Sequence, residues 1–526
     1  MTHDPINTGA NTRAVKRTLS EEEESHIEAA LDTIRMGKQA LLFFGSRRSA
    51  EKAADDVSSA IRRRASIIET IESEKLAHLS RGIRAALPSP TKQCERLANA
   101  ARHGAAFHHS GLAGSQRSLI EEAFRDKTLR VICATPTLAA GVDLPSFRTI
   151  IRDSKRFSNY GMQYIPVLEY LQMAGRSGRP SYDEYGESIL IAKTAPHKRE
   201  LYERYILGEP EEITSKLAAE PALRTHILAL IANGIVSSTE ELERFIARTF
   251  YAYQYRDQRR LSFIIDKIIS FLAQEGFITS ESEPPADDPF VSAADLGAGG
   301  LSITPLGTRV SELYLDPLSA ATMIRAMRSE RAELVGYVHL LSLMLELRPL
   351  PSVRKADYET IESFITQSED SFLIEPDFES YDELLKQAKL SVIILSWLDE
   401  MTEDRLLETY DITPGHLYAK LEICDWLCYS ASEIAAVLAL REQRRRFQKL
   451  RTLLKYGIRE ELLPLVRIRG IGRKRARMLY SKGITSASDI ANTPEDTLAR
   501  ILGEKTARSL KQRTQEKVTF DTQRTL

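Results

Sequence analysis

The sequence predicts an α/β domain with a parallel sheet, followed by domains that are mostly α-helical. Short apolar runs, such as Ala40–Phe44 and Leu129–Cys133, alternate with helical patterns, and this alternation is typical of a parallel sheet. From about residue 203 the pattern changes to short helices, and from residue 306 to longer ones. We therefore expect one sheet-containing domain followed by helical domains.

Length and composition limit the class of protein. The chain has 526 residues, of which 43% are hydrophobic and 28% charged, so several soluble globular domains are expected. No apolar run reaches the ~18 residues of a membrane span. Residues 1–18 lack the apolar core of a signal peptide and are expected to be disordered. These features predict a cytoplasmic protein that does not contact a membrane.

The charge is unevenly distributed. The net charge is −1, but the segment from Arg441 to the C-terminus has 22 Lys and Arg against 9 Asp and Glu, a net charge of +13. A basic region on an otherwise acidic chain indicates a contact with nucleic acid.

No residues have the spacing of a metal site. Cys424 and Cys428 lie one helical turn apart without a second pair, so all four cysteines are expected to be inert thiols. His108 and His109 are adjacent, and neighbours in a strand point to opposite faces, so they are not expected to share an ion.

The predicted strand Ala40–Phe44 leads through Gly45-Ser-Arg-Arg-Ser into a helix, which places Arg47 and Arg48 in a strand-to-helix loop. The strand that ends at Cys133 leads into ATPTLAAGVDLP, which contains Thr135, Gly141 and Asp143.

A second stretch, QMAGRSGRP, has a spacing suited to anion binding. Gln172, Arg176 and Arg179 are separated by four and three residues, which predicts that they share one face of a helix. Gly175 and Gly178 leave room for backbone or ligand to approach. Two guanidiniums in succession suit a triphosphate, which they can bind bidentately.

A hairpin is predicted between these two stretches, because Ser158-Asn-Tyr-Gly is turn material between two short β-prone arms. The arms and turn combine charge with aromatic side chains: Lys155, Arg156, Phe157 and Tyr160. An aromatic side chain at a hairpin tip can stack on the last base pair of a duplex. The alternative is a surface hairpin that only packs on another domain.

The strings TPTLAAGVDLP and QMAGRSGRP resemble motifs V and VI of superfamily-two helicases. They are similar in particular to archaeal DNA repair helicases of the Ski-like branch, which are related to the motor half of polymerase theta. The resemblance implies a second RecA-like motor lobe over residues 19–202, working with ATP and Mg²⁺. It implies that Arg176 and Arg179, with Gln172, act on the γ-phosphate.

Further roles follow from the same resemblance. Thr135, Gly141 and Asp143 couple the nucleotide state to the DNA strand. Arg47 and Arg48 lie in a loop similar to motif IV, near the nucleic-acid backbone. The hairpin at 154–164 wedges between the strands of a duplex.

The helical part divides into three predicted domains. Residues 203–305 resemble a winged helix, and residues 306–440 form a helical bundle. The last helix of this bundle has an apolar stripe, with Trp426 roughly opposite. Trp426 matches the place of an aromatic residue on the ratchet helix of the family, which stacks on the translocating strand; packing against a neighbouring domain is the alternative.

Residues 441–526 form a basic domain whose Ile468-Arg-Gly-Ile-Gly core resembles a helix-hairpin-helix. Gly470 and Gly472 allow the turn to expose amides at a helix N-terminus, which is suited to phosphate. Arg473, Lys474 and Arg477 add positive charge. Such a unit holds the DNA backbone without reading its sequence.

The sequence contains no G-x-x-x-x-G-K-[ST] motif, and its single Gly-Lys pair, Gly37-Lys38, has the wrong context. We therefore expect a first motor lobe on a partner chain or on a longer polypeptide, and no ATPase activity from this chain alone. The predicted function is the C-terminal part of a 3′–5′ DNA helicase acting on single-stranded or forked DNA in replication-linked repair. The alternatives are an RNA helicase of the same branch and a non-catalytic DNA-binding paralogue.

Overall fold

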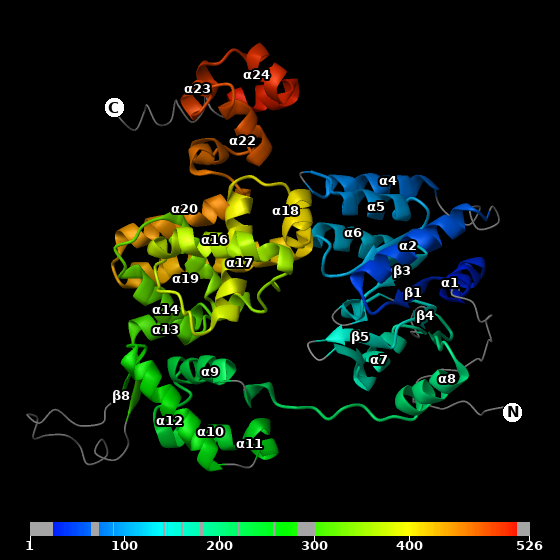
Figure 1. Ribbon diagram of the computed structural model, residues 1–526, viewed down its shortest axis with the longest axis horizontal. Helices are drawn as coiled ribbons and strands as arrows, with labels where there is room; N and C mark the ends of the chain where they lie inside the picture. The colour runs from blue at the N-terminus through cyan, green and yellow to red at the C-terminus, as the bar shows by residue number, and fades with distance from the viewer. Residues whose placement is uncertain are drawn as a thin grey trace, which may run out of the picture. The chain divides into compact units, whose positions relative to one another are not determined.

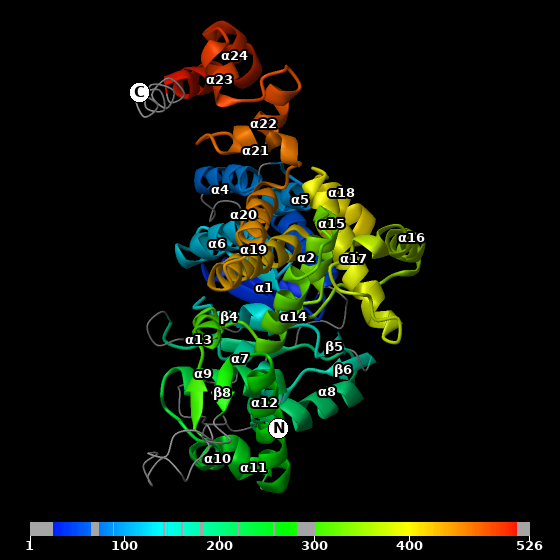
Figure 2. The same ribbon diagram turned by 90° about the vertical axis from the view of Figure 1, so that its left-hand side faces the viewer.

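The computed structural model describes residues 25–64, 73–87, 89–139, 142–144, 146–158, 161–178, 183–218, 220–255, 258–280 and 300–512. The predicted disordered segment 1–18 lies outside these ranges. The chain forms two compact units (Figures 1 and 2). The first unit extends to Ile213 and includes Asp411–Tyr418, and the second comprises Thr214–Tyr410 and the residues from Ala419 onward.

The first unit contains a five-stranded sheet with the order β2-β3-β1-β4-β7, in which every pair of neighbouring strands is parallel. The strands are β1 (Ala40–Phe43), β2 (Ala105–His108), β3 (Val131–Ala134), β4 (Arg148–Ile151) and β7 (Glu187–Leu190). β1 to β4 are buried along their whole length, as expected for strands covered by helices on both faces. The predicted parallel sheet is confirmed.

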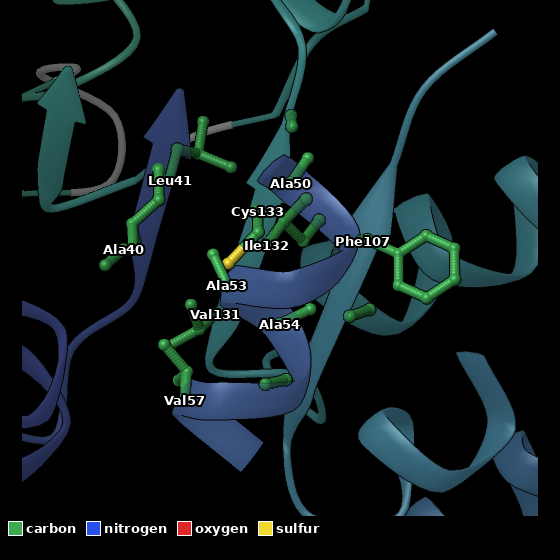
Figure 3. Close-up of a cluster of buried hydrophobic side chains, with 14 of the residues drawn as sticks. Ala40, Leu41, Ala50, Ala53, Ala54, Val57, Phe107, Val131, Ile132 and Cys133 are labelled. Atoms are coloured by element: carbon green, nitrogen blue, oxygen red, sulfur yellow. The ribbon is translucent and has the colours of Figure 1, made fainter. Parts of the chain in front are cut away.

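Helices precede, connect and follow the strands of this sheet (Figure 1). They are α1 (Ser25–Arg35), α2 (Arg47–Arg62), α4 (Ser73–Ala85), α5 (Lys92–Ala101), α6 (Gly114–Arg125), α7 (Val167–Ala174) and α8 (Ala195–Leu201). Helix α2 begins after Ser46, whose hydroxyl accepts a hydrogen bond from the Ser49 N–H. Its alanine-rich face packs on β2 and β3, and Figure 3 shows this face against the side chains of the sheet. The small side chains allow the helix to lie close to the sheet.

A hairpin interrupts the path from β4 to α7. Its strands, β5 (Lys155–Ser158) and β6 (Gly161–Tyr164), are antiparallel, with Phe157 opposite Met162. The predicted hairpin is therefore confirmed. At its base the Tyr205 hydroxyl lies 2.8 Å from the Ile165 carbonyl oxygen and 3.2 Å from that of Ser154.

The second unit begins with three longer helices and one short one: α9 (Glu220–Ala232), α10 (Thr239–Ala247), α11 (Phe250–Tyr255) and α12 (Gln258–Gln274). A strand pair follows, formed by β8 (Ile278–Ser280) and β9 (Leu301–Ile303), which are antiparallel. Residues 281–299, between these two strands, lie outside the described residues.

A helical bundle forms the centre of the second unit. It comprises α13 (Pro305–Glu312), α14 (Pro317–Met327), α15 (Leu334–Ser342), α16 (Tyr358–Ser368), α17 (Tyr381–Leu398), α18 (Glu403–Tyr410), α19 (Pro414–Val437) and α20 (Arg441–Tyr456). The first turn of α19 belongs to the first unit, where the Gly415 N–H donates to the Gly111 carbonyl at 3.0 Å. The predicted apolar stripe of α19 is buried from Leu417 to Ala431.

The C-terminal part of the described chain contains the short helices α21 (Leu463–Val466), α22 (Arg473–Tyr480), α23 (Ala487–Asn492) and α24 (Glu495–Leu502), followed by a helical stretch at 504–512. The predicted class, a parallel α/β domain followed by mostly helical domains, is thus confirmed. Among the described helices, none is long and apolar enough to cross a membrane.

Candidate functional site

The loops at the carboxyl ends of β1 to β4 are connected to one another. In parallel α/β sheets, ligands bind outside this edge. The Gly45 N–H, after β1, donates to the Asp153 carboxylate, after β4, at 3.0 Å. The Thr135 N–H, after β3, donates to the last carbonyl of β2, that of His108, at 3.2 Å. These bonds hold the loops of the sheet in a fixed relation.

Arg47 and Arg48 begin α2 at this edge, and Arg48 is exposed. The Nη1 atom of Arg47 lies 3.2 Å from Nδ1 of His416, and Nε2 of His416 lies 3.2 Å from the Ser110 hydroxyl. Because a guanidinium can only donate, Nδ1 accepts and the ring proton is on Nε2. Sequence reasoning missed His416, since a contact across 369 positions leaves no local signal.

The two adjacent histidines have separate partners. Nε2 of His108 lies 3.0 Å from the Glu121 carboxylate, and Nε2 of His109 lies 3.1 Å from that of Glu51. Burial lowers the pKa of His108, against the opposing effect of Glu121. The described residues include no group of His, Cys, Asp and Glu that could hold a metal ion. All four cysteines are buried, as predicted.

The expectation that Gln172 and Arg176 share a helical face was wrong. Helix α7 ends at Ala174, because the Arg176 N–H bonds to the Met173 carbonyl at 3.1 Å and so leaves the α-helical pattern. Gln172 is exposed on the last turn of α7, and Arg176 lies in the turn that follows. Arg179 lies outside the described residues.

Arg176 joins the two stretches on which the sequence analysis centred. Its guanidinium donates to the Val142 carbonyl at 2.5 Å and to the Ala139 carbonyl. Its own carbonyl accepts from the Ser146 N–H at 3.1 Å. Burial lowers the pKa of Arg176. A half-buried guanidinium therefore connects the turn after α7 to the loop after β3.

Of the residues predicted for the loop after β3, the structure describes Thr135 and Asp143. Thr135 is buried, and its hydroxyl lies 2.9 Å from that of Thr137. Asp143 is exposed, and its carbonyl accepts from the Arg125 Nε–H at 3.4 Å. Gly141 lies outside the described residues.

Gly178 allows a close approach of two backbone segments, as predicted. Its φ is +70°, and a Cβ atom there would lie 2.5 Å from the backbone nitrogen of Gly186. A Cβ atom on Gly186 would in turn overlap the backbone of Gly178. Two glycines therefore let the turn after α7 pack against the start of β7.

The hairpin exposes apolar side chains. Phe157 is 79% exposed and Met162, directly across, is 64% exposed. Arg156 pairs with Glu169 of α7 at 2.8 Å, and the Lys155 ammonium lies 4.1 Å from the Tyr164 ring centre. Tyr160 lies outside the described residues. Two contacts thus hold the arms, while the pair Phe157 and Met162 faces solvent.

Trp426 is half-buried in the second unit. Its indole N–H donates to the Leu313 carbonyl at 3.2 Å. The neighbouring Asp425 forms an ion pair with Arg451 at 2.8 Å. The indole is therefore fixed at one edge within the bundle.

The turn before α22 contains the two glycines that the sequence analysis predicted for phosphate binding. Gly470 has φ +96°, and Gly472 is the N-cap residue, with open space where a Cβ would lie. Lys474 is exposed. Two neighbouring arginines have partners within the chain: Arg473 donates to the Met401 carbonyl at 2.8 Å, and Arg477 pairs with Glu400 and Glu461.

Four family profiles match successive parts of the chain. Residues 73–181 match the helicase conserved C-terminal domain, and residues 186–279 match a helix-turn-helix domain. Residues 335–457 match domain 4 of an archaeal helicase, and residues 462–516 match a SAM-like helix-hairpin-helix tandem.

Several curated proteins are similar along almost the whole chain, and each is named ATP-dependent DNA helicase Hel308. The protein of Methanocella arvoryzae is 36% identical over 94% of this chain and 65% of its own length. That of Pyrococcus horikoshii is 37% identical over 92% and 65%, and that of Methanococcus vannielii is 32% identical over 94% and 68%. The chain thus spans 65% of the length of the first two relatives.

Proposed function

This chain belongs to the Hel308 family of ATP-dependent DNA helicases, and from this premise we propose that it supplies the second motor lobe and the DNA-binding domains of such a motor. The motor moves 3′ to 5′ on single-stranded or forked DNA in replication-linked repair. The observation that carries the proposal is the bond network of Arg176, which links the turn after α7 to the loop after β3.

ATP cleavage needs positive charge at the γ-phosphate in addition to a phosphate-binding loop and Mg²⁺. We assign the charge to Arg176 and Arg179, with Gln172 beside them. A first motor lobe, on a longer polypeptide or in trans, holds ATP and Mg²⁺. Nothing in this chain's sequence matches the phosphate-binding motif, so this chain alone is proposed to have no DNA-stimulated ATPase activity.

Arg176 also provides the coupling between nucleotide and DNA. Its guanidinium donates to the carbonyls of Ala139 and Val142. Phosphate oxygens compete for the same donors, because charge-assisted bonds are the stronger ones. When the γ-phosphate binds, the Arg176 guanidinium therefore no longer donates to the loop that contains Thr135, Gly141 and Asp143. The contact of this loop with the DNA strand changes as a result.

The DNA-side elements act in sequence along the strand. The hairpin at 154–164 separates the duplex, and Trp426 contacts a base during translocation. The turn from Gly470 to Arg477 holds the backbone of the exiting strand, and Arg47 and Arg48 contact the backbone at the sheet edge. The exposure of Phe157 and Met162 leaves both side chains of the hairpin available to a nucleic acid, which supports the hairpin role.

The decisive experiment adds the first lobe of a Hel308 protein in trans and measures DNA-stimulated ATP hydrolysis. We expect activity with both parts, none with this chain alone, and loss of activity on Arg179→Ala. Arg35→Ala, at an exposed arginine of α1, is the matched control and should keep the activity. Hydrolysis by this chain alone, or an Arg179→Ala variant as active as the parent, would contradict the proposal.

An RNA helicase of the same branch is the second candidate, and a non-catalytic DNA-binding protein the third. The helix-hairpin-helix match over 462–516 favours DNA, because such units bind the DNA backbone. Competition between single-stranded DNA and RNA of one sequence separates the first two functions. The third is chosen if DNA binds but no first lobe restores ATP hydrolysis.

A further inference from the structure

Tyr314 occupies a position in the second unit that local structure does not favour. Helix α13 ends at Glu312, and the Tyr314 N–H donates to the Ser311 carbonyl at 3.0 Å. The Leu315 N–H closes the wider bond to the Val310 carbonyl at 3.4 Å, and both of these side chains are fully buried. This is a Schellman motif, whose left-handed residue is usually glycine and sometimes asparagine.

A tyrosine at this place is strained. Its φ is +55°, in the left-handed region where the Cβ atom crowds the backbone. Among the described residues other than glycine, five have positive φ, and Tyr314 is the only aromatic one. Its side chain is 81% exposed, so core packing does not offset the strain. A residue that breaks a local rule without a gain in packing indicates a function.

The residue before Tyr314 holds the indole of Trp426. The Leu313 carbonyl accepts the indole N–H at 3.2 Å, so the backbone that bears the Tyr314 ring also fixes one edge of Trp426. The half-buried indole is therefore hydrogen-bonded to the backbone one residue before the exposed phenol of Tyr314.

The charges near this turn are already paired. Arg309 of α13 contacts Glu433 at 2.5 Å, and Arg451 contacts Asp425 at 2.8 Å while its guanidinium lies 5.1 Å from the Tyr429 ring centre. Paired arginines have less charge to offer to phosphate. An aromatic ring is suited instead to the face of an unpaired base, since every base has such a face.

We propose that Tyr314 is a second base-stacking residue, which works with Trp426 to hold single-stranded DNA on the helical bundle. The inference rests on the proposed function, because it deepens the DNA contact assigned there to Trp426. The ligand is an unpaired nucleobase, and the contact does not depend on its identity. The Schellman bonds hold the backbone at Tyr314 and so fix the direction in which its Cα–Cβ bond leaves the end of α13, while the ring itself is exposed.

The test is the affinity of the full chain for a fluorescent oligothymidylate, together with its thermal stability. Tyr314→Gly relieves the strained φ, so the melting temperature should stay the same or rise. The same change removes the ring, so the affinity should fall by roughly 5- to 150-fold, the range for one base–aromatic stack. Tyr314→Phe keeps the ring and should bind like the parent.

Two further measurements separate stacking from other roles. The ratio of parent to Tyr314→Gly affinity should be the same at low and high salt, because stacking releases no counterions. Phe263→Ala removes another exposed ring of the second unit, one that is 70% exposed on α12, and should leave the affinity unchanged.

Parent-like affinity of Tyr314→Gly would show that the tyrosine is only a helix cap and would overturn this inference alone. If the parent chain failed to bind the oligonucleotide, the proposed function and this inference would both be overturned.

Discussion

At the scale of single residues, the histidine at position 339 is unusual because neither ring nitrogen has a hydrogen-bond partner among the described residues. The ring is fully buried and stacks on Phe372 with ring centres 3.7 Å apart. Burial lowers the pKa of His339 to about 4. Between about pH 6.5 and pH 4 the unfolded chain therefore binds one proton more than the folded chain, and stability falls as pH falls.

We expect His339→Leu to remove this pH dependence. At pH 5 the lost stabilisation is about 2 kcal/mol, from 1.36 kcal/mol per pKa unit. Urea unfolding at pH 7.5 and pH 5.0 measures the difference, followed by tryptophan fluorescence, since both tryptophans, Trp397 and Trp426, lie in the same unit as His339. The exposed His226 of the same unit provides a control, because His226→Leu should keep the parent's pH dependence. An unchanged pH dependence in His339→Leu would contradict the assignment.

Gly186 gives a second prediction at this scale. Its backbone faces that of Gly178 so closely that a Cβ atom would overlap it. Gly186→Ala should destabilise the first unit by several kcal/mol, because backbone must move. Gly114→Ala is the control, since a Cβ there would meet only the end of the Arg117 side chain, at 3.9 Å. Calorimetric melting would disprove the prediction if both variants melted alike.

At the scale of elements, helix α7 shows how a long-range partner replaces a local cap. Its N-cap residue is Pro166, whose side chain cannot accept a hydrogen bond. The Glu211 carboxylate accepts from the Val167 N–H at 2.7 Å and the Leu168 N–H at 3.1 Å instead. These bonds lower the pKa of Glu211. The helix that leads to Arg176 is thus held at its start by a residue 44 positions later.

The hairpin gives a prediction at the same scale. Tyr205 contacts the carbonyls on both sides of its base through one hydroxyl, at Ser154 and Ile165. Tyr205→Phe should loosen the hairpin and slow strand separation more than it slows ATP hydrolysis, because the residues proposed to act on the nucleotide lie outside the hairpin. The same pattern is expected for Phe157→Ala.

The measurement compares unwinding of a forked duplex with ATPase activity on single-stranded DNA in the reconstituted motor. Leu168→Ala, at an exposed residue of α7, serves as the control and should affect neither rate. Equal losses of both rates in Tyr205→Phe would rule out a specific role of the hairpin.

At the scale of the whole molecule, the positive charge is concentrated at the C-terminal end, where residues 441–526 have a net charge of +13. Binding to DNA should therefore weaken steeply with salt. Lys474→Ala should reduce the slope of log K against log salt by about 0.7–0.9, as expected for one lost phosphate contact. Arg477→Ala is the comparison, because Arg477 pairs with Glu400 and Glu461. Its loss should lower the melting temperature, and it should change the salt slope less than Lys474→Ala does.

Titration of a labelled single strand at four salt concentrations gives these slopes. A Lys474→Ala slope equal to that of the parent would exclude a phosphate contact at this residue.

The sequence by itself determined the class of fold, the hairpin and the residue types suited to phosphate and DNA. Apolar periodicity is set by which side chains must be buried, and turn chemistry is set by local φ and ψ, so both can be read along the chain. The close approach of two backbone segments at Gly178 was also predictable, because glycine is the residue that leaves room for it.

Only the tertiary structure decided the partners of these groups. The bonds of Arg176 to Ala139 and Val142, of Arg47 to His416, and of α7 to Glu211 join positions far apart in the chain. The end of α7 at Ala174 also follows from the structure, since helical spacing alone continued it to Arg179. Polar side chains take whichever donors and acceptors the packing of apolar elements brings near, and that choice leaves no periodic trace in the sequence.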